Sequence, residues 1–163
     1  MLNWYAIYVR SRHEFASNCE LLKKGIKTYL PTIKRLSQWR DRKKLVEFPL
    51  FPGYLFVHIC VSDYLNVLRT RGVVSLLSSE AGSPITVPEE EINSLKLLLD
   101  SGCGINIYPQ FKEGTSVFIR KGALRGAAGV VVRKEGQFIF VVNIHILGRS
   151  VGVKIYAEDL EAA

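Results

Sequence analysis

The chain has 163 residues, 48% of them hydrophobic and 23% charged, a composition typical of a globular protein with one ordinary domain or two small ones. No apolar run approaches the roughly 20 residues of a membrane-spanning helix, and the N-terminus lacks the basic-then-apolar pattern of a secretory signal. We therefore expect a cytoplasmic protein that has no membrane partner.

The net charge of +7 is concentrated near the start of the chain. Residues 1–58 hold 11 Lys and Arg against 4 Asp and Glu, whereas residues 59–110 hold 3 against 6. This asymmetry is typical of a protein that works near nucleic acid, although a solvated basic face is the alternative.

Cysteine and histidine give no sign of a metal or catalytic site. The three cysteines are far apart and form no Cys-x-x-Cys pair, so we expect them to be free and buried. The three histidines are equally scattered, and no glycine loop for phosphate is present. The sequence therefore predicts a protein that is not an enzyme and has no cofactor.

Residues 4–9 are predicted to form a strand, whose alternation places Trp4, Ala6 and Tyr8 on one face. A helix follows, because Ser11 and Glu14 have the spacing of a capping box, in which Glu14 reaches back to the helix start. The expected apolar stripe of this helix consists of Phe15, Cys19 and Leu22.

A basic hairpin is predicted next. Residues 28–36 and 43–48 have the pattern of two strands joined by a polar tip, residues 37–42. An aromatic ring among cations suits single-stranded nucleic acid, but Trp39 packed on the hairpin stem, with its charges solvated, is an equal alternative. The candidate nucleic-acid-binding residues here are Trp39, Arg40, Arg42, Lys43 and Lys44.

Residues 48–57 form an aromatic run interrupted by Pro49, Pro52 and Gly53. Proline cannot donate to a sheet ladder, so the start of the run is expected at an edge or bend, and residues 54–57 are expected to form a strand. This strand has two apolar faces, one for the core and one for a second layer or a partner. The candidate partner-binding residues are Tyr8, Phe51, Pro52, Tyr54 and Phe56, with burial by the third helix or the second domain as the alternative.

A short helix over residues 64–70 and a strand over 73–78 complete a βαββαβ order. This order is typical of an α+β ferredoxin-like sandwich with helices on one side of an antiparallel sheet. A third helix is predicted to begin near Pro88 and three following glutamates. Residues 101–110 resemble a linker, so the expected first domain is 1–100.

Residues 111–163 are predicted to form a second domain. Short β-rich segments alternate with seven glycines between Gly114 and Gly152, and a last pairing segment is expected around 153–156. This pattern is typical of a small SH3-like barrel. Residues 115–150 are poorly suited to helices, because four of these glycines would each cost about 1 kcal/mol there.

Several motifs now resemble one family, the NusG-type transcription elongation and antitermination factors. The motifs of their N-terminal (NGN) domain are Trp4-Tyr5-Ala6-Ile7-Tyr8, Phe51-Pro52-Gly53-Tyr54, Arg71-Gly72-Val73-Val74 and Val87-Pro88-Glu89-Glu90-Glu91. The glycine-spaced KOW motif of their C-terminal domain is carried here by Gly114, Arg120, Gly122, Gly126 and Gly129. Residues 47–57 look closer to the specialised RfaH and UpxY-type paralogues.

The resemblance implies a monomer whose N-terminal domain binds the clamp-helix coiled coil of RNA polymerase and suppresses pausing or termination. It also implies that Asn66, Arg69, Thr70 and Arg71 lie near the non-template DNA strand or nascent RNA. The KOW domain would recruit a second factor, such as Rho or a small-subunit ribosomal protein. A ribosome-associated RNA-binding KOW protein is the alternative, but it does not account for the aromatic run.

Overall fold

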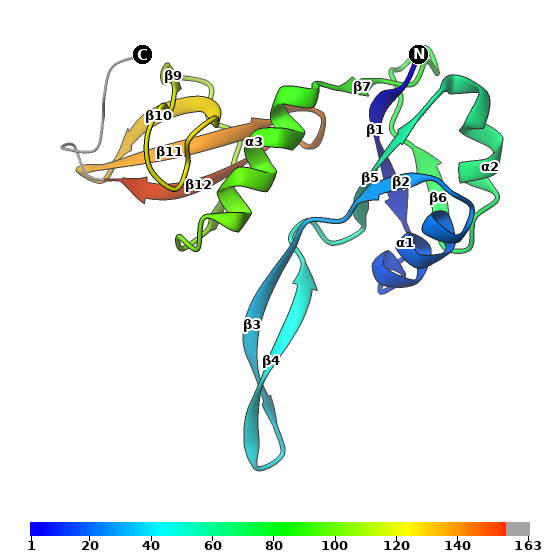
Figure 1. Ribbon diagram of the computed structural model, residues 1–163, viewed down its shortest axis with the longest axis horizontal. Helices are drawn as coiled ribbons and strands as arrows, with labels where there is room; N and C mark the ends of the chain where they lie inside the picture. Colours follow the sequence, from blue (N-terminus) through cyan, green and yellow to red (C-terminus); the bar gives the residue numbers. More distant parts are fainter. Residues whose placement is uncertain (156–163) are drawn as a thin grey trace. The chain divides into compact units, whose positions relative to one another are not determined.

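The computed structural model describes residues 1–155 and divides at Thr86/Val87 into two compact units. The fold is mixed α/β, with three α-helices and two five-stranded sheets in the described part of the chain (Figure 1). No described helix has both the length and the apolar character needed to cross a membrane.

The first unit contains one sheet in the order β2-β5-β1-β6, in which neighbouring strands are antiparallel and β7 also pairs with β1. A separate two-stranded ribbon, β3–β4, is inserted before β5. In chain order, the elements up to residue 87 are β1 (Asn3–Val9), α1 (Glu14–Lys23), β2 (Lys27–Tyr29), β3 (Thr32–Trp39), β4 (Arg42–Pro49), β5 (Tyr54–Ile59), a 3-10 turn (Val61–Asp63), α2 (Tyr64–Leu68), β6 (Val73–Leu76) and β7 (Thr86–Val87).

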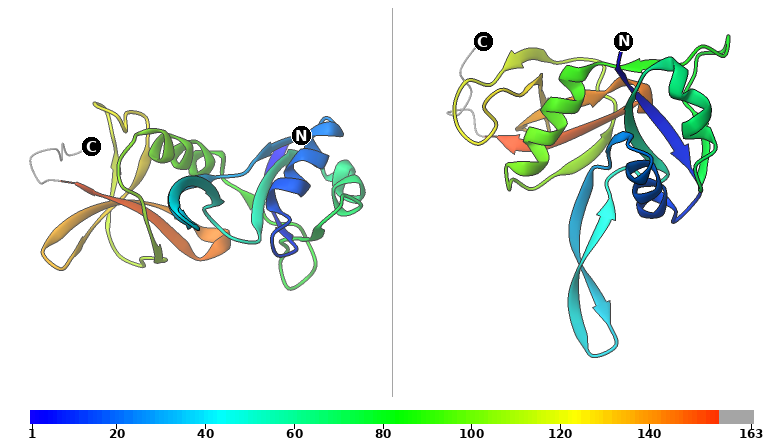
Figure 2. Two further views of the ribbon diagram at one scale, coloured as in Figure 1. Left: turned by 90° about the horizontal axis from the view of Figure 1, so that it is seen from below. Right: turned by 45° about the vertical axis from the view of Figure 1, so that its right-hand side comes forward.

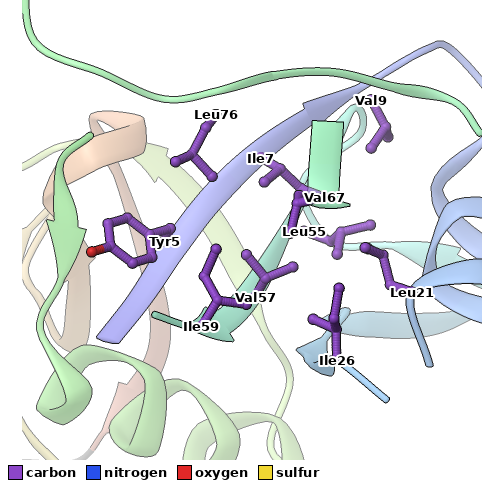
Figure 3. Close-up of a cluster of buried hydrophobic side chains, with 10 residues drawn as sticks. All are labelled: Tyr5, Ile7, Val9, Leu21, Ile26, Leu55, Val57, Ile59, Val67 and Leu76. Atoms are coloured by element: carbon purple, nitrogen blue, oxygen red, sulfur yellow. The ribbon is translucent and has the colours of Figure 1, made fainter. Parts of the chain in front are cut away.

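The core of the first unit lies between one face of this sheet and helices α1 and α2. Alternate residues of β1 and β5, such as Ile7 and Leu55, meet Leu21 of α1 and Val67 of α2 (Figure 3). These four side chains are fully buried. Since both helices use this face, the opposite face of the sheet carries the other alternating set of side chains.

Helix α1 packs on a different face from the one predicted. Its buried residues are Glu14, Ser17 and Leu21, whereas Phe15 and Leu22 are 41% and 52% exposed. The predicted capping box was also wrong, because the helix begins after His13 without a side-chain cap. Two polar side chains, Glu14 and Ser17, thus lie on the packed face of α1. They can be buried there because each has a hydrogen-bond partner in a neighbouring loop.

The hairpin was predicted, but its strands run further than expected toward the tip. Trp39 pairs with Arg42, which leaves only Arg40 and Asp41 in the turn. The ribbon extends away from the sheet of the first unit (Figure 1 and the right panel of Figure 2). No residue of β3 or β4 is buried, so polar residues can occupy both faces of the ribbon. In the sequence, such a polar stretch resembles a loop.

The second unit contains α3 (Glu89–Asp100) and a sheet in the order β8-β12-β11-β10-β9. Ile92, Leu95 and Leu98 of α3 are fully buried, and the helix contacts β10, β11 and β12. The elements of the sheet are β8 (Asn106–Pro109), β9 (Thr115–Phe118), β10 (Ala128–Lys134), β11 (Gln137–Ile144), a 3-10 turn (His145–Leu147) and β12 (Arg149–Ile155).

The observed elements differ in three places from the expected boundaries of the second half of the chain, and the expected domain limit itself stays a prediction. The division between the units precedes α3, whereas the linker was expected at 101–110. Within that expected linker, residues 106–109 form strand β8. The expected pairing segment at 153–156 belongs to β12 as far as Ile155, and residues 156–163 lie outside the described residues.

The cysteines are free, as predicted, but they are not part of the core. Cys19 and Cys103 are exposed and Cys60 is partly buried. The prediction that they would be buried was therefore wrong for Cys19 and Cys103. Cys19 is exposed because it lies outside the packed face of α1, as Phe15 does.

Candidate functional site

An aromatic surface covers the side of the first sheet opposite α1 and α2. Strand pairing sets Trp4 beside His58 and Tyr8 beside Tyr54, with ring centroids 4.8 Å and 5.4 Å apart. Tyr29 of β2 stacks on Phe56 at 6.3 Å. We call this surface the aromatic face, and it consists of Trp4, Tyr8, Tyr29, Tyr54, Phe56 and His58.

The partner-binding residues predicted from the sequence differ in exposure. Tyr8 is 41% exposed, Pro52 is exposed and Tyr54 is partly buried. The rings of Phe51 and Phe56 are fully buried. The structure thus brings these residues together around one turn and one strand pair, but only Tyr8, Pro52 and Tyr54 reach the surface; we call these three the aromatic rim.

The turn before β5 holds the aromatic rim in place. Gly53 has a φ of +88°, a conformation that favours glycine, and an added Cβ would lie 3.1 Å from the Tyr8 ring. The amide of Gly53 donates to the Glu14 carboxylate at 2.9 Å, and its carbonyl accepts from the Val9 amide at 2.8 Å. The pattern Pro-Gly-Tyr is therefore explained by the close approach of this turn to β1.

The basic ribbon has two different faces. Strand alternation places Arg35, Ser37, Trp39, Arg42 and Lys44 on one face, which we call the Trp39 face. Trp39 is 53% exposed, and the Lys44 ammonium lies 5.2 Å from its ring centroid. The opposite face carries Lys43 and the exposed cross-strand pair of Leu36 and Leu45.

Arg40 occupies the turn with a φ of 31°, so its side chain belongs to neither strand face. The five ribbon residues predicted to bind nucleic acid are thus all exposed, but only Trp39, Arg42 and Lys44 share one surface. The sequence did not identify Arg35 as a member of this surface, although period-two alternation from Trp39 would have placed it there.

The second predicted nucleic-acid group follows α2. Asn66, Arg69 and Arg71 are exposed, whereas Thr70 is only 4% exposed. The Thr70 hydroxyl donates to the Asn66 carbonyl at 3.0 Å and accepts from the Lys24 ammonium at 2.9 Å. Thr70 therefore joins α2 to the end of α1, and the two arginines are the accessible cations of this group.

The glycines of the second unit have structural explanations. A Cβ at Gly129 would lie 2.3 Å from the Val141 carbonyl, and one at Gly114 would lie 2.9 Å from the Val132 side chain. Gly122 and Gly126 have φ values of +82° and +93°, which favour glycine in turns. Arg120 is exposed beside these turns.

Two buried polar residues of the first unit were not recognised from the sequence. Glu14 was assigned to a helix cap and Ser17 to no role, yet they are 6% and 0% exposed. Their spacing of three and four residues, which places them on one helix face with Leu21, is a sequence signal that could have identified them. Among residues 1–155, no cluster of His, Cys, Asp or Glu could hold a metal ion.

Comparison with known proteins identifies the family. The model described as "Transcription termination factor nusG" matches residues 2–96, which is more than half of the chain. The protein is therefore a transcription factor of the termination and antitermination class and not an enzyme. It belongs to the NusG family.

Curated relatives and a solved structure carry the same family name. The transcription termination/antitermination protein NusG of Chlamydia trachomatis serovar D is 28% identical over 181 residues, covering 99% of this chain and 92% of the relative. The corresponding Streptococcus pyogenes serotype M1 protein is 27% identical over 148 residues and covers 82% of each. The structure described as "Domain interaction in Thermotoga maritima NusG" matches 98% of this chain and 96% of that one, with 23% identity and a TM-score of 0.49.

Proposed function

We propose that this protein regulates transcript elongation by binding the clamp-helix coiled coil of RNA polymerase through the aromatic rim. The observation that carries the proposal is that Tyr8 and Pro52 are exposed and Tyr54 is partly exposed, with the two tyrosines paired on the sheet face opposite α1 and α2. Aromatic anchors surrounded by polar groups supply much of the affinity of protein interfaces.

Phe51 and Phe56 have a supporting role in this proposal. Their rings are fully buried, so direct contact with the polymerase would require them to become exposed. We infer that they shape the surface from below, while the rim makes the contacts. Replacing either ring by alanine would typically cost about 3–5 kcal/mol of stability through loss of buried volume, so neither substitution tests binding cleanly.

The nucleic-acid contacts are proposed for the Trp39 face of the ribbon and for Arg69 and Arg71. The cations of these surfaces are exposed, and phosphate contacts by lysine and arginine give affinity without sequence specificity. The non-template DNA strand or nascent RNA would supply the phosphates, and Trp39 would supply a stacking surface for an unpaired base.

The two units are proposed to be the two domains of the family. Strand order β2-β5-β1-β6 with helices on one side supports a ferredoxin-like NGN domain. The five-stranded sheet β8–β12 supports an SH3-like KOW barrel that recruits a second factor, with Rho and a small-subunit ribosomal protein as candidates. A monomeric protein in the cytoplasm fits this role.

A specialised role within the family is part of the proposal. Residues 47–57 resemble RfaH and UpxY-type paralogues, and identity to curated NusG proteins is 28% or below among the relatives described above. A specialised factor would act on few operons, whereas a general one would accompany polymerase on most genes. Occupancy of the protein along the genome, measured beside that of polymerase, separates these two roles.

Binding of purified core RNA polymerase tests the proposed function. Tyr54→Ala should weaken binding by about 2 kcal/mol or more, which corresponds to about 30-fold in the dissociation constant. Phe15→Ala is a matched control, because Phe15 is an aromatic residue of the same unit with 41% exposure on the outer side of α1. A folded Tyr54→Ala variant that binds at full strength would refute the assignment.

Two further measurements separate the proposed function from the alternative. Run-off transcription on the operon leader of the protein, with and without the protein, should show a change in pausing or termination. Co-purification from cells should recover polymerase subunits. Recovery of ribosomal particles instead would favour a ribosome-associated RNA-binding protein.

A further inference from the structure

Helix α1 places two polar side chains inside the first unit, where burial is costly unless each has a hydrogen-bond partner. Glu14 and Ser17 are 6% and 0% exposed. The Glu14 carboxylate accepts from the Gly53 amide at 2.9 Å, and the Ser17 hydroxyl donates to the Arg71 carbonyl at 2.7 Å. Neighbouring turns of one helix therefore hold two loops that are far apart in the sequence. The first loop contains Gly53, and the second contains Arg71 and Gly72.

The end of β1 holds the same two loops by backbone bonds. The Val9 amide donates to the Gly53 carbonyl and the Arg10 amide donates to the Gly72 carbonyl, both at 2.8 Å. Each loop is thus attached at two points, once to the backbone at or just after the end of β1 and once to a side chain of α1. We call this set, Val9, Arg10, Glu14 and Ser17, the loop clamp.

The fit between the loop clamp and the second loop is close. Gly72 has a φ of +85°, and an added Cβ would lie 2.4 Å from the Ser17 hydroxyl oxygen and 2.9 Å from the Cβ of His13. Gly53 in the first loop also has a left-handed backbone. The second loop therefore packs closely against the start of α1, whereas the first loop approaches Tyr8 of β1 and reaches α1 through the Glu14 carboxylate.

We propose that the loop clamp positions the aromatic rim relative to Arg69 and Arg71, so that one rigid body presents both surfaces. The inference rests on the proposed function, because these two surfaces are the ones assigned to polymerase and to nucleic acid. The first loop carries Pro52 and leads into Tyr54, and the second loop carries Arg71. Glu14 and Ser17 are positioning residues, which act through the loops and do not touch a partner.

Glu14 is the residue whose chemistry gives the sharpest test. An ionised carboxylate is a strong acceptor for a backbone amide, and Glu14→Ala leaves the buried Gly53 amide without this partner. Glu14→Gln removes the charge but keeps a side-chain oxygen that can accept the same bond. The glutamine variant should therefore restore what the alanine variant loses, whereas a purely electrostatic role would not be restored.

The experiment measures amide hydrogen exchange by NMR and affinity for purified core RNA polymerase in the same full-length variants. Glu14→Ala should speed exchange of the Gly53 amide and weaken polymerase binding, each by about tenfold. Glu14→Gln should stay within about threefold of the unaltered protein in both measurements, since one hydrogen bond of a neutral acceptor is retained. Glu20→Ala, on the exposed side of α1, is the control and should change neither.

Ser17→Ala provides a second variant that tests the other loop and keeps the proposal falsifiable if Glu14→Ala fails to fold. It should speed exchange of the Arg10 amide, which donates to the Gly72 carbonyl of the second loop, and leave the Gly53 amide unchanged. If Glu14→Ala lowers only the melting temperature, with Gly53 exchange and affinity unchanged, the positioning role is overturned. If the unaltered protein does not bind polymerase, the proposed function fails, while the exchange rates of the Gly53 and Arg10 amides still decide whether the loop clamp holds the loops.

Discussion

At the scale of single residues, Gly129 is the glycine at which an added side chain would have the least room. A side chain there would lie 2.3 Å from the Val141 carbonyl, a contact that strand β10 can relieve only by moving away from β11. Overpacking of this kind typically costs about 1–3 kcal/mol. We therefore expect Gly129→Ala to lower the free energy of unfolding by at least this amount in urea denaturation.

Gly104 provides the matched control for this substitution. Its backbone has no positive φ, and nothing lies within 4 Å of an added Cβ, so Gly104→Ala should be neutral or slightly stabilising. Equal effects of the two substitutions would show that the contact at Gly129 does not determine the stability of the second unit.

Individual residues also show what the sequence can and cannot predict. The spacing of glycines predicted turns in the second unit, and Gly122 and Gly126 have the positive φ values that favour glycine in turns. The close contact at Gly129 was not predicted. The spacing of Ser11 and Glu14 predicted a local cap, but the carboxylate bonds to Gly53, which is 39 residues away. Local patterns do not reveal a partner that only the tertiary fold brings near.

At the scale of elements, the ribbon β3–β4 offers a comparison between two faces that each carry at least two cations. Arg42 and Lys44 lie on the Trp39 face, while Lys34 and Lys43 lie on the opposite face. The affinity of the protein for single-stranded DNA should fall as salt rises, and the slope of log K against log salt concentration measures the number of phosphate contacts. If nucleic acid binds the Trp39 face, the double substitution Arg42→Ala/Lys44→Ala should reduce the magnitude of this slope by about 0.7 per lost phosphate contact.

Fluorescence anisotropy at several salt concentrations measures this slope for both double variants. Lys34→Ala/Lys43→Ala removes the same charge and should change the slope less. Equal reductions for the two pairs would indicate that the ribbon acts through its overall charge, and its faces would then have no separate roles.

The helices show why element faces are harder to predict than element positions. The sequence indicated all three α-helices and most strands, since hydrophobic periodicity and turn residues are local signals. The predicted packed face of α1 was wrong. The stripe of Phe15, Cys19 and Leu22 was chosen because it is apolar, whereas the helix buries Leu21 together with two polar residues that are hydrogen-bonded. The aromatic face depends in the same way on strand register, which sets Tyr8 beside Tyr54.

At the scale of the whole molecule, the family was accessible from the sequence, whereas the expected domain limit after α3 stays a prediction. Composition changes after residue 100, so a linker was expected there, and the family model also runs to residue 96. The contacts of α3 nevertheless join it to β10, β11 and β12. The Ser94 hydroxyl accepts from the Ala128 amide at 2.9 Å, and the Glu91 carboxylate accepts from the His145 amide at 3.0 Å.

Fragments that end on either side of α3 test where the domain limit lies. The fragment 87–163 should be more stable in urea than 101–163, because burial of Ile92, Leu95 and Leu98 contributes roughly 1.5–3 kcal/mol per side chain. Within 87–163, Leu95→Ala should cost about 2–5 kcal/mol, whereas Asn93→Ala, at an exposed position of the same helix, should cost little. If 101–163 is as stable as 87–163, and 1–100 is more stable than 1–86, then α3 belongs to the first domain in solution, as the change in composition after residue 100 predicts.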